Sequence, residues 1–145
     1  MFLEAKNALV FKKGNETLMI EPWGANSFRV RSTMEPNFID RDWALTERIN
    51  HGNAKISVTE QGASIINGKI EAKVNNNGII TFYKDGEKIL HEYHRSYDPS
   101  ATKESCCTKV INRQWQGIIG GDYKLSVRFE SNDSEKIFGM GFFLW

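Results

Sequence analysis

The feature that most constrains this chain is a succession of short β-type segments separated by Gly, Asn and Asp. In Ser27–Ser32, Phe28 and Val30 alternate with Arg29 and Arg31, which is the pattern of a half-buried strand. Similar patterns predict further strands around Leu18 and Ile20 and at Lys55–Glu60, Gly68–Val74, Ile79–Lys84, Glu87–Glu92, Lys109–Ile119 and Asp122–Ser131. Many short strands with regular turn signals favour an all-β antiparallel sandwich or barrel over an α/β fold.

Turn residues predict how these strands are connected. Asn75–Gly78 and Asp85-Gly86 separate three of the segments, and Asn-Gly and Asp-Gly supply the positive φ angles that tight hairpin turns require. Gly68–Glu92 is therefore predicted to be a three-stranded meander. Gly120-Gly121 predicts a second hairpin between the last two segments.

The chain is predicted to form one domain over residues 1–145, because no repeat, low-complexity tract or linker divides it. Only Ile39–Ile49 could form a short helix, and its apolar pattern is poor. His91–Cys107 is the longest stretch without a strand pattern, and loops of this length are often functional or lie against a partner.

The charge balance and the cysteines restrict partners and compartment. With 19 basic and 18 acidic residues, the chain lacks the basic excess that drives nucleic-acid binding. It also lacks a Lys/Arg run for an anionic membrane and an apolar run of roughly 20 residues that could cross one. Glu4 and Lys6 interrupt any signal-peptide pattern, and the adjacent Cys106 and Cys107 rarely form a disulfide together, so we expect a cytoplasmic protein.

Few residues are candidates for chemistry. Asp40 and Asp42 form a close carboxylate pair beside Trp43, which could bind a sugar or act in acid/base catalysis, but a solvated loop explains them more simply. His91 and His94 could grip a metal on a helix, but no third ligand is evident and they are interpreted as surface histidines.

The remaining candidates also favour a structural interpretation. Cys106 lacks an identifiable electropositive setting, and Gly120-Gly121 and Gly139-x-Gly141 lack the strand-to-helix context of nucleotide-binding loops. Some aromatic residues could stack on sugar rings, although core or interface packing is the simpler interpretation: Trp23, Trp43, Tyr97 and Trp115. No residue is therefore assigned as catalytic, cofactor-binding or metal-binding, and no cofactor is predicted.

Four segments carry a family resemblance when taken together and in order. They are TLMIEPWGANSFRVRS (Thr17–Ser32), FIDRDWALTE (Phe38–Glu47), the meander Gly68–Glu92, and YKLSVRFESNDSEKIFGMG (Tyr123–Gly141). Together these segments resemble the N-terminal β-sandwich, of the galactose mutarotase-like type, of family 31 glycoside hydrolases, the group of α-glucosidases and α-xylosidases.

The resemblance implies a domain without the catalytic residues. The family hydrolyses α-glycosides with retention at two aspartates, one forming a covalent glycosyl-enzyme and the other serving as general acid/base, about 5–5.5 Å apart. Both lie in a (β/α)8 barrel that follows the sandwich in the family, so no catalytic residue is carried over to this chain. We therefore expect a chain truncated before the barrel and inactive by itself, whose partner is the barrel of the same parent polypeptide.

Two further features bear on partners. The apolar segment Ile137–Trp145 predicts either packing against something outside this chain or a return into the sandwich core. Exposed apolar surface or free edge strands would favour self-association. The alternative function is a stand-alone carbohydrate-binding sandwich that binds oligosaccharides through two or three exposed aromatic residues, and a weaker one is an interaction module that uses its edge strands.

Overall fold

Antiparallel β-strands make up the regular structure. The computed structural model describes residues 1–5, 7–39, 54–96 and 109–131, and within these ranges it contains eleven strands and no helix. The strands are β1 (Phe2–Ala5), β2 (Ala8–Lys13), β3 (Glu16–Pro22), β4 (Phe28–Thr33), β5 (Lys55–Thr59), β6 (Gly62–Asn67), β7 (Ile70–Asn75), β8 (Ile80–Lys84), β9 (Glu87–His91), β10 (Arg113–Gly117) and β11 (Tyr123–Val127).

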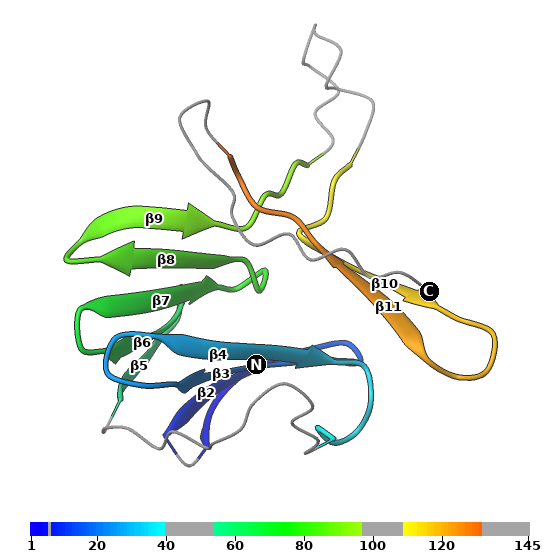
Figure 1. The fold of residues 1–145 in the computed structure, drawn as a ribbon, viewed down its shortest axis with the longest axis horizontal. Coiled ribbons are helices and arrows are strands. Elements are labelled where there is room, and N and C mark those ends of the chain that lie inside the picture. Colours follow the sequence, from blue (N-terminus) through cyan, green and yellow to red (C-terminus); the bar gives the residue numbers. More distant parts are fainter. Residues whose placement is uncertain (6, 40–53, 97–108, 132–145) are drawn as a thin grey trace, which may run out of the picture.

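The strands form two larger sheets and a separate hairpin. One sheet has the order β1-β2-β3-β4, the second has the order β5-β6-β7-β8-β9, and β10 pairs with β11. Every neighbouring pair is antiparallel, so both larger sheets are meanders joined by turns. In Figure 1 the two sheets lie together and the β10–β11 hairpin extends away from them to one side. The predicted all-β antiparallel sandwich is confirmed.

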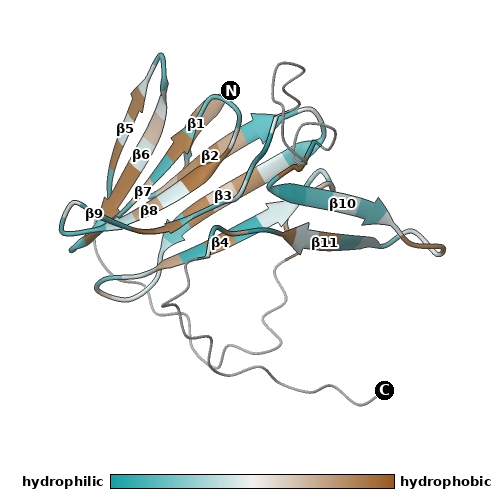
Figure 2. Cartoon of the chain, turned by 90° about the horizontal axis from the view of Figure 1, so that it is seen from above, coloured by the Kyte–Doolittle hydropathy of each residue, from teal (hydrophilic) through white to brown (hydrophobic). Residues whose placement is uncertain are grey.

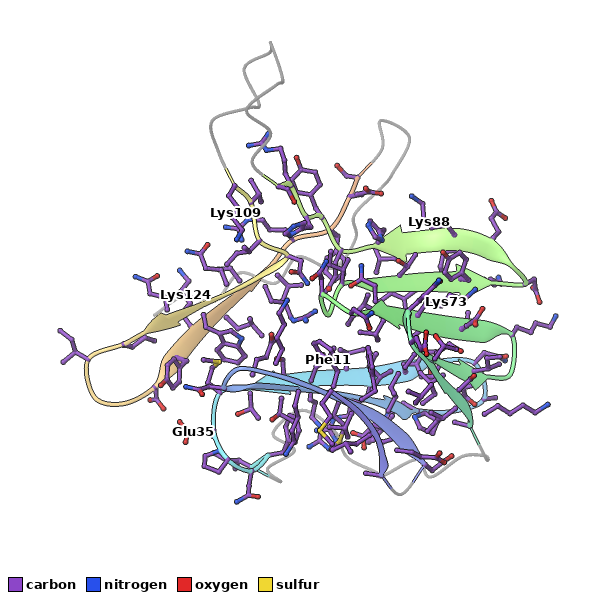
Figure 3. All side chains as sticks on the ribbon, turned by 180° about the vertical axis from the view of Figure 1, so that it is seen from behind. Phe11, Glu35, Lys73, Lys88, Lys109 and Lys124 are labelled. Carbon is purple, nitrogen blue, oxygen red and sulfur yellow. The ribbon has the colours of Figure 1, made fainter. Side chains whose placement is uncertain are left out.

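The core lies between the two larger sheets, and Phe11 stands in this space (Figure 3). Its fully buried members come from both sides: Leu9, Phe11, Leu18 and Ile20 from the four-stranded sheet, and Ala63, Ile65, Ala72, Val74 and Ile80 from the five-stranded sheet. Burying each large aliphatic or aromatic side chain contributes roughly 1.5–3 kcal/mol. The core therefore holds the two meanders face to face.

The tight turn between β8 and β9 forms as its Asp-Gly sequence predicts. Asp85 and Gly86 have φ angles of 49° and 86°, which place both in the left-handed region. This is the backbone of the primed turns that match the twist of a hairpin. The predicted meander is thus observed as β7–β9, and β5 and β6 extend it to five strands.

Strand β2 was not predicted, because its first residues form a continuous apolar run with no alternation. Ala8, Leu9, Val10 and Phe11 are all buried, so both faces of this strand are covered and no period-2 pattern arises. The structure also adds β1 and β6, which were not predicted. The long predicted segment Lys109–Ile119 forms a strand only at β10.

Two valines depart from the predicted burial. Val30 and Val58 were placed on the buried faces of their strands, yet Val30 is 40% exposed and Val58 is 51% exposed. Val58 lies on β5, an edge strand of its sheet. Val30 points inward with Leu18 and Ile20, but it lies where the sandwich is open, as described below. The arginines beside it are less exposed than Val30 itself.

The predicted irregular stretch His91–Cys107 begins with paired backbone. Tyr93 N donates to Arg128 O at 2.8 Å, and Glu130 N donates to His91 O at 2.8 Å. Arg95 forms an isolated antiparallel bridge with Val110. Residues 97–108 lie outside the described part of the chain, as does all but the first residue of the predicted helix Ile39–Ile49. The described residues include no helix with the length and apolar character needed to cross a membrane.

Candidate functional site

A buried charged junction connects the two sheets and the hairpin. It consists of Glu16, Glu92, Asn112 and Arg113, together with the carbonyl of Gly78. Arg113 begins β10, Glu16 begins β3, and Glu92 directly follows β9. One arginine therefore contacts three separate parts of the fold.

Arg113 uses three of its nitrogen atoms in this junction. Nη1 donates to both carboxylate oxygens of Glu92 at 2.6 Å, Nε donates to Glu16 Oε1 at 2.6 Å, and Nη2 donates to Gly78 O at 2.6 Å. Ser32 Oγ of β4 also donates to Glu16 Oε1, at 2.7 Å. Charge-assisted bonds of this kind are stronger than neutral ones.

The carboxylate of Glu92 is almost completely enclosed. Its residue is 2% exposed, and its Oε2 accepts from Ile80 N at 2.9 Å and from Asn112 Nδ2 at 2.7 Å, in addition to Arg113. A buried carboxylate needs such partners, because desolvation penalises an unpaired charge heavily. Both carboxylate oxygens of Glu92 therefore accept hydrogen bonds that stabilise the fold.

This geometry favours a structural role over catalysis. A retaining glycosidase needs two carboxyl groups that reach opposite sides of a sugar. Here Glu16 and Glu92 both bind the same guanidinium, and Glu92 is closed to solvent. The junction instead sets the angle at which the hairpin leaves the sandwich.

An apolar cavity of about 260 Å³ lies beside the junction. Its walls come from β3, β4, β8, β9 and the hairpin, with Glu92 and Arg113 at one end. The lining side chains are Leu18, Val30, Ser32, Ile80, Phe82, Leu90, Leu125, Val127 and Phe129. Leu125, Val127 and Phe129 occupy alternate positions within the predicted strand Asp122–Ser131, and all three line this cavity.

A second apolar hollow of about 260 Å³ continues from the first along the edges of the two sheets. It shares Val30, Phe82 and Leu90 with the cavity and adds Phe28 and Ile89. We call these two hollows together the open side of the sandwich. Val30, Ile89, Val127 and Phe129, which line it, are between 40% and 51% exposed. Apolar residues gathered in this way indicate a surface that another molecule or segment covers.

The hairpin carries a mixed surface beyond its base. Trp115 of β10 meets Tyr123 of β11 edge to face, with ring centroids 6.0 Å apart. At the tip, Ile118 and Ile119 are exposed, and Figure 2 shows this loop as hydrophobic against a largely hydrophilic β10. The hairpin thus presents aromatic and apolar groups away from the sandwich.

The two histidines singled out in the sequence have different partners. His91 Nδ1 lies 2.7 Å from Thr81 Oγ1 of the neighbouring strand, and His94 Nε2 lies 3.3 Å from Ser96 Oγ. Within the described ranges, the structure contains no group of three or more His, Cys, Asp or Glu side chains that could hold a metal. Residues 97–108, which include both cysteines, are outside those ranges.

The aromatic candidates that the structure describes are engaged in packing. The Arg29 guanidinium lies over the Trp23 ring at 5.0 Å, and Arg31 lies over Phe38 at 5.0 Å. Glu21 pairs with Arg31 at 3.0 Å on the same face. The other sequence candidates, which are Asp40, Asp42, Trp43, Tyr97, Cys106, Cys107, Gly139 and Gly141, lie outside the described residues, as does the segment Ile137–Trp145.

The junction itself was missed by sequence reasoning. Alternation assigns charged residues to the solvent face, so Glu92 was predicted only as the end of the strand Glu87–Glu92, and Arg113 only as a position within the strand Lys109–Ile119. Their pairing joins positions 21 residues apart across two sheets, and no local pattern encodes such a contact.

Comparison with known proteins identifies relatives of this chain. No family model matches it. It is 34% identical over 148 aligned residues to an uncharacterized family 31 glucosidase of Pseudescherichia vulneris, a match that covers 96% of this chain and 28% of that protein. It also matches the crystal structure of a GH31 α-xylosidase from a soil metagenome, complexed with xylose, with a TM-score of 0.80 and 36% identity.

The lengths of these matches define what the chain corresponds to. The structural match covers 92% of this chain and 21% of the α-xylosidase, so the chain spans between 21% and 28% of the proteins that it matches. Sequence and fold agree over nearly the whole chain. The chain is therefore a relative of the family 31 glycoside hydrolases and corresponds to one β-sandwich domain of these larger proteins.

Proposed function

We propose that this chain is a non-catalytic domain of a family 31 glycoside hydrolase, which packs on the catalytic barrel of the same polypeptide and helps to shape the mouth of its active site. The proposal comprises an α-glucosidase or α-xylosidase activity for the whole protein and none for residues 1–145 alone. It also retains a cytoplasmic location, which the adjacent Cys106 and Cys107 favour.

The observation that carries this proposal is the open side of the sandwich. Within the part of the chain that the structure describes, Val127 of β11, Phe129 just after it and Val30 of β4 leave apolar surface exposed between the two sheets. A sandwich normally closes its core on itself. A domain whose core is open along one side gains stability when a neighbouring domain covers it, and more than two thirds of each matched protein lies beyond this match.

The charged junction supports the same proposal. Arg113 fixes the base of the hairpin to Glu16 and Glu92 with bonds of 2.6 Å, so the hairpin leaves the sandwich in a defined direction. A projecting hairpin can shape a neighbouring active site only if its orientation is fixed, because a small displacement disturbs the alignment of the reacting groups. The hairpin therefore has the rigidity that such a role requires.

The first experiment tests the purified chain for hydrolysis of aryl α-glucosides and α-xylosides. We expect no turnover, because Glu16 and Glu92 are both held by Arg113 and Glu92 is enclosed. Turnover that is absent from a mock purification and is lost in a Glu16→Gln variant would show that the chain itself is catalytic.

The second experiment tests the docking. The chain replaces the corresponding segment of the soil α-xylosidase, and xyloside hydrolysis and the melting transition of the graft are measured. We expect the graft to be active and Val127→Asp to abolish activity, whereas Ile119→Asp at the exposed tip leaves assembly intact. A graft whose activity tolerates Val127→Asp contradicts packing through the open side.

The alternative of a stand-alone carbohydrate-binding sandwich stays a prediction. It requires two or three exposed aromatic rings on one surface, and in the described part of the chain the exposed rings are Tyr123 and Phe129. Phe129 lines the apolar cavity, which suits packing better than a sugar. The weaker alternative uses edge strands, and among the strands that the structure describes β1, β4, β5 and β9 each pair on one side only.

A further inference from the structure

The outer side of the five-stranded sheet carries a shallow depression of about 400 Å³, which is formed by β5, β6 and β7 and combines polar side chains with apolar lining. It faces away from the core, because Ala72 and Val74 of β7 point inward while Glu71 and Lys73 alternate with them. We call it the outer depression. Its apolar lining comes from Gly62, Ala63 and Val74, and its polar lining is Ser57, Thr59, Gln61, Ser64, Glu71, Lys73 and Asn75.

The side chains of Ser57, Gln61 and Ser64 can each form further hydrogen bonds. Ser57 and Ser64 are direct cross-strand partners, and Ser64 in turn pairs with Lys73 on β7. Cβ atoms of such partners lie about 4.5–5.5 Å apart, so the side chains of Ser57, Ser64 and Lys73 form one row across the sheet. Within the residues that the structure describes, the side chains of Ser57, Gln61 and Ser64 bind no other group.

A charged pair stands at the end of this row. Lys73 Nζ lies 3.4 Å from Glu71 Oε2, and the ammonium also lies over the Tyr83 ring at 4.8 Å. The Lys73 side chain is 53% exposed and can donate further hydrogen bonds, because an ammonium has three donors. The carboxylate of Glu71 can accept more. Because the two charges offset each other, the depression favours a neutral ligand over an ion.

The polar groups of the outer depression together favour one chemical class of ligand. A carboxylate that accepts and an ammonium that donates, side by side, can bind two neighbouring hydroxyl groups of one ligand, and the serine hydroxyls and the Gln61 amide can do either. A shallow surface that combines such groups with apolar lining suits a sugar, whose ring carries both hydroxyl groups and apolar C–H faces. We propose that the outer depression is a binding site for a neutral saccharide, with Glu71, Lys73 and Ser64 as its central contacts.

This site is separate from the open side and does not rest on the proposed docking. Its central polar side chains, Ser64, Glu71 and Lys73, lie on the solvent face of β6 and β7, whereas docking uses the inner faces of β4, β8, β9 and β11. Figure 3 labels Lys73 on the five-stranded sheet and Phe11 in the core between the sheets. The domain could therefore hold a sugar here whether or not its open side is covered.

Calorimetric titration of the 145-residue chain with maltotriose and with xylotriose tests the proposal. We expect weak, saturable binding of at least one sugar, in the millimolar range. Glu71→Gln and Ser64→Val should each raise Kd at least tenfold, because each removes a hydrogen-bonding group from the centre of the depression. Far-UV circular dichroism and the melting transition establish that each variant is folded.

Tyr123→Ala serves as the matched control, since it removes the exposed aromatic ring of the hairpin and leaves the outer depression unchanged. Unchanged Kd in this variant, with loss of binding in Glu71→Gln, supports the proposal. A flat titration with both sugars overturns it, and so does binding that Tyr123→Ala weakens while Glu71→Gln does not.

Discussion

Arg113 Nη1 donates to both carboxylate oxygens of Glu92 at 2.6 Å, and Glu92 is 2% exposed. The two residues come from different parts of the fold, since Glu92 directly follows β9 and Arg113 begins β10. The pair therefore makes the position of the hairpin depend on a buried ionic contact. Glu16 and Gly78 O complete the shell of the guanidinium.

Arg113→Met is expected to destabilise the chain by about 3–5 kcal/mol, because it leaves the buried carboxylate of Glu92 without its charge partner. Urea unfolding followed by fluorescence measures the change. The double variant Glu92→Leu/Arg113→Met should recover a large part of the loss, since apolar pairs often replace buried ion pairs at little cost. A single-variant loss below about 1 kcal/mol would contradict the structural role given to the pair.

The matched control is an exposed pair of the same charge type. Lys88 Nζ lies 3.1 Å from Glu130 Oε2, and the two side chains are 55% and 46% exposed. Lys88→Met should change stability by roughly 0–1 kcal/mol, because solvent screens exposed ion pairs. The contrast with Arg113→Met isolates the effect of burial.

Gly78→Ala is expected to destabilise the chain more than Gly86→Ala. Both glycines have positive φ angles, 82° and 86°, so both substitutions carry backbone strain of roughly 1 kcal/mol. A Cβ at Gly78 would also come within 2.5 Å of Phe11 Cε1 and 3.2 Å of Arg113 Nη2, whereas a Cβ at Gly86 meets nothing within 4 Å. Melting temperatures of the two variants test this order, and equal shifts would mean that Phe11 and Arg113 relax freely.

The sequence predicts much of the fold because local chemistry decides it. The Asp85-Gly86 turn and the alternation of Ile70, Ala72 and Val74 are local signals, and the structure follows them. Strand β2 escapes prediction because both of its faces are buried, which removes the alternation. Whether an inward position such as Val30 is covered depends on neighbouring sheets, which a local pattern does not contain.

The candidate sites were harder to predict, for a physical reason. The charged junction joins residues that are separated by up to 97 positions, Glu16 and Arg113, and charged residues in strands are normally assigned to solvent. The outer depression depends on the register that sets Ser57 opposite Ser64 and Ser64 opposite Lys73. Register arises from the packing of the buried faces and from the turns together, so it becomes visible only once the sheet is assembled.

Phe129→Ser is expected to reduce the apolar surface that the chain presents through its open side. Phe129 is 45% exposed and lines the cavity, so the dye ANS should bind the unaltered chain and bind the variant less. Sedimentation velocity should also show less self-association at high concentration. Ile119→Ser at the fully exposed hairpin tip is the control, and an equal reduction in that variant would assign the dye binding to the tip.

Val127→Phe separates the stability of the domain from its docking. Val127 lines the apolar cavity of about 260 Å³, so a larger side chain has room to fill it, and cavity filling commonly adds about 0.5–2 kcal/mol. Ser126→Phe, on the opposite face of β11, is the control and should add no stability. Urea unfolding of the chain alone measures this gain.

In the α-xylosidase graft the same Val127→Phe substitution is expected to lower activity, because the added ring occupies space that the neighbouring domain would otherwise use. If the open side is a docking surface, Val127→Phe raises the stability of the chain alone and lowers the activity of the graft, whereas Ser126→Phe changes neither. A gain in stability with full activity in the graft would instead mean that the cavity is an internal packing defect of the sandwich, and the open side would then lose its role as the contact with the barrel.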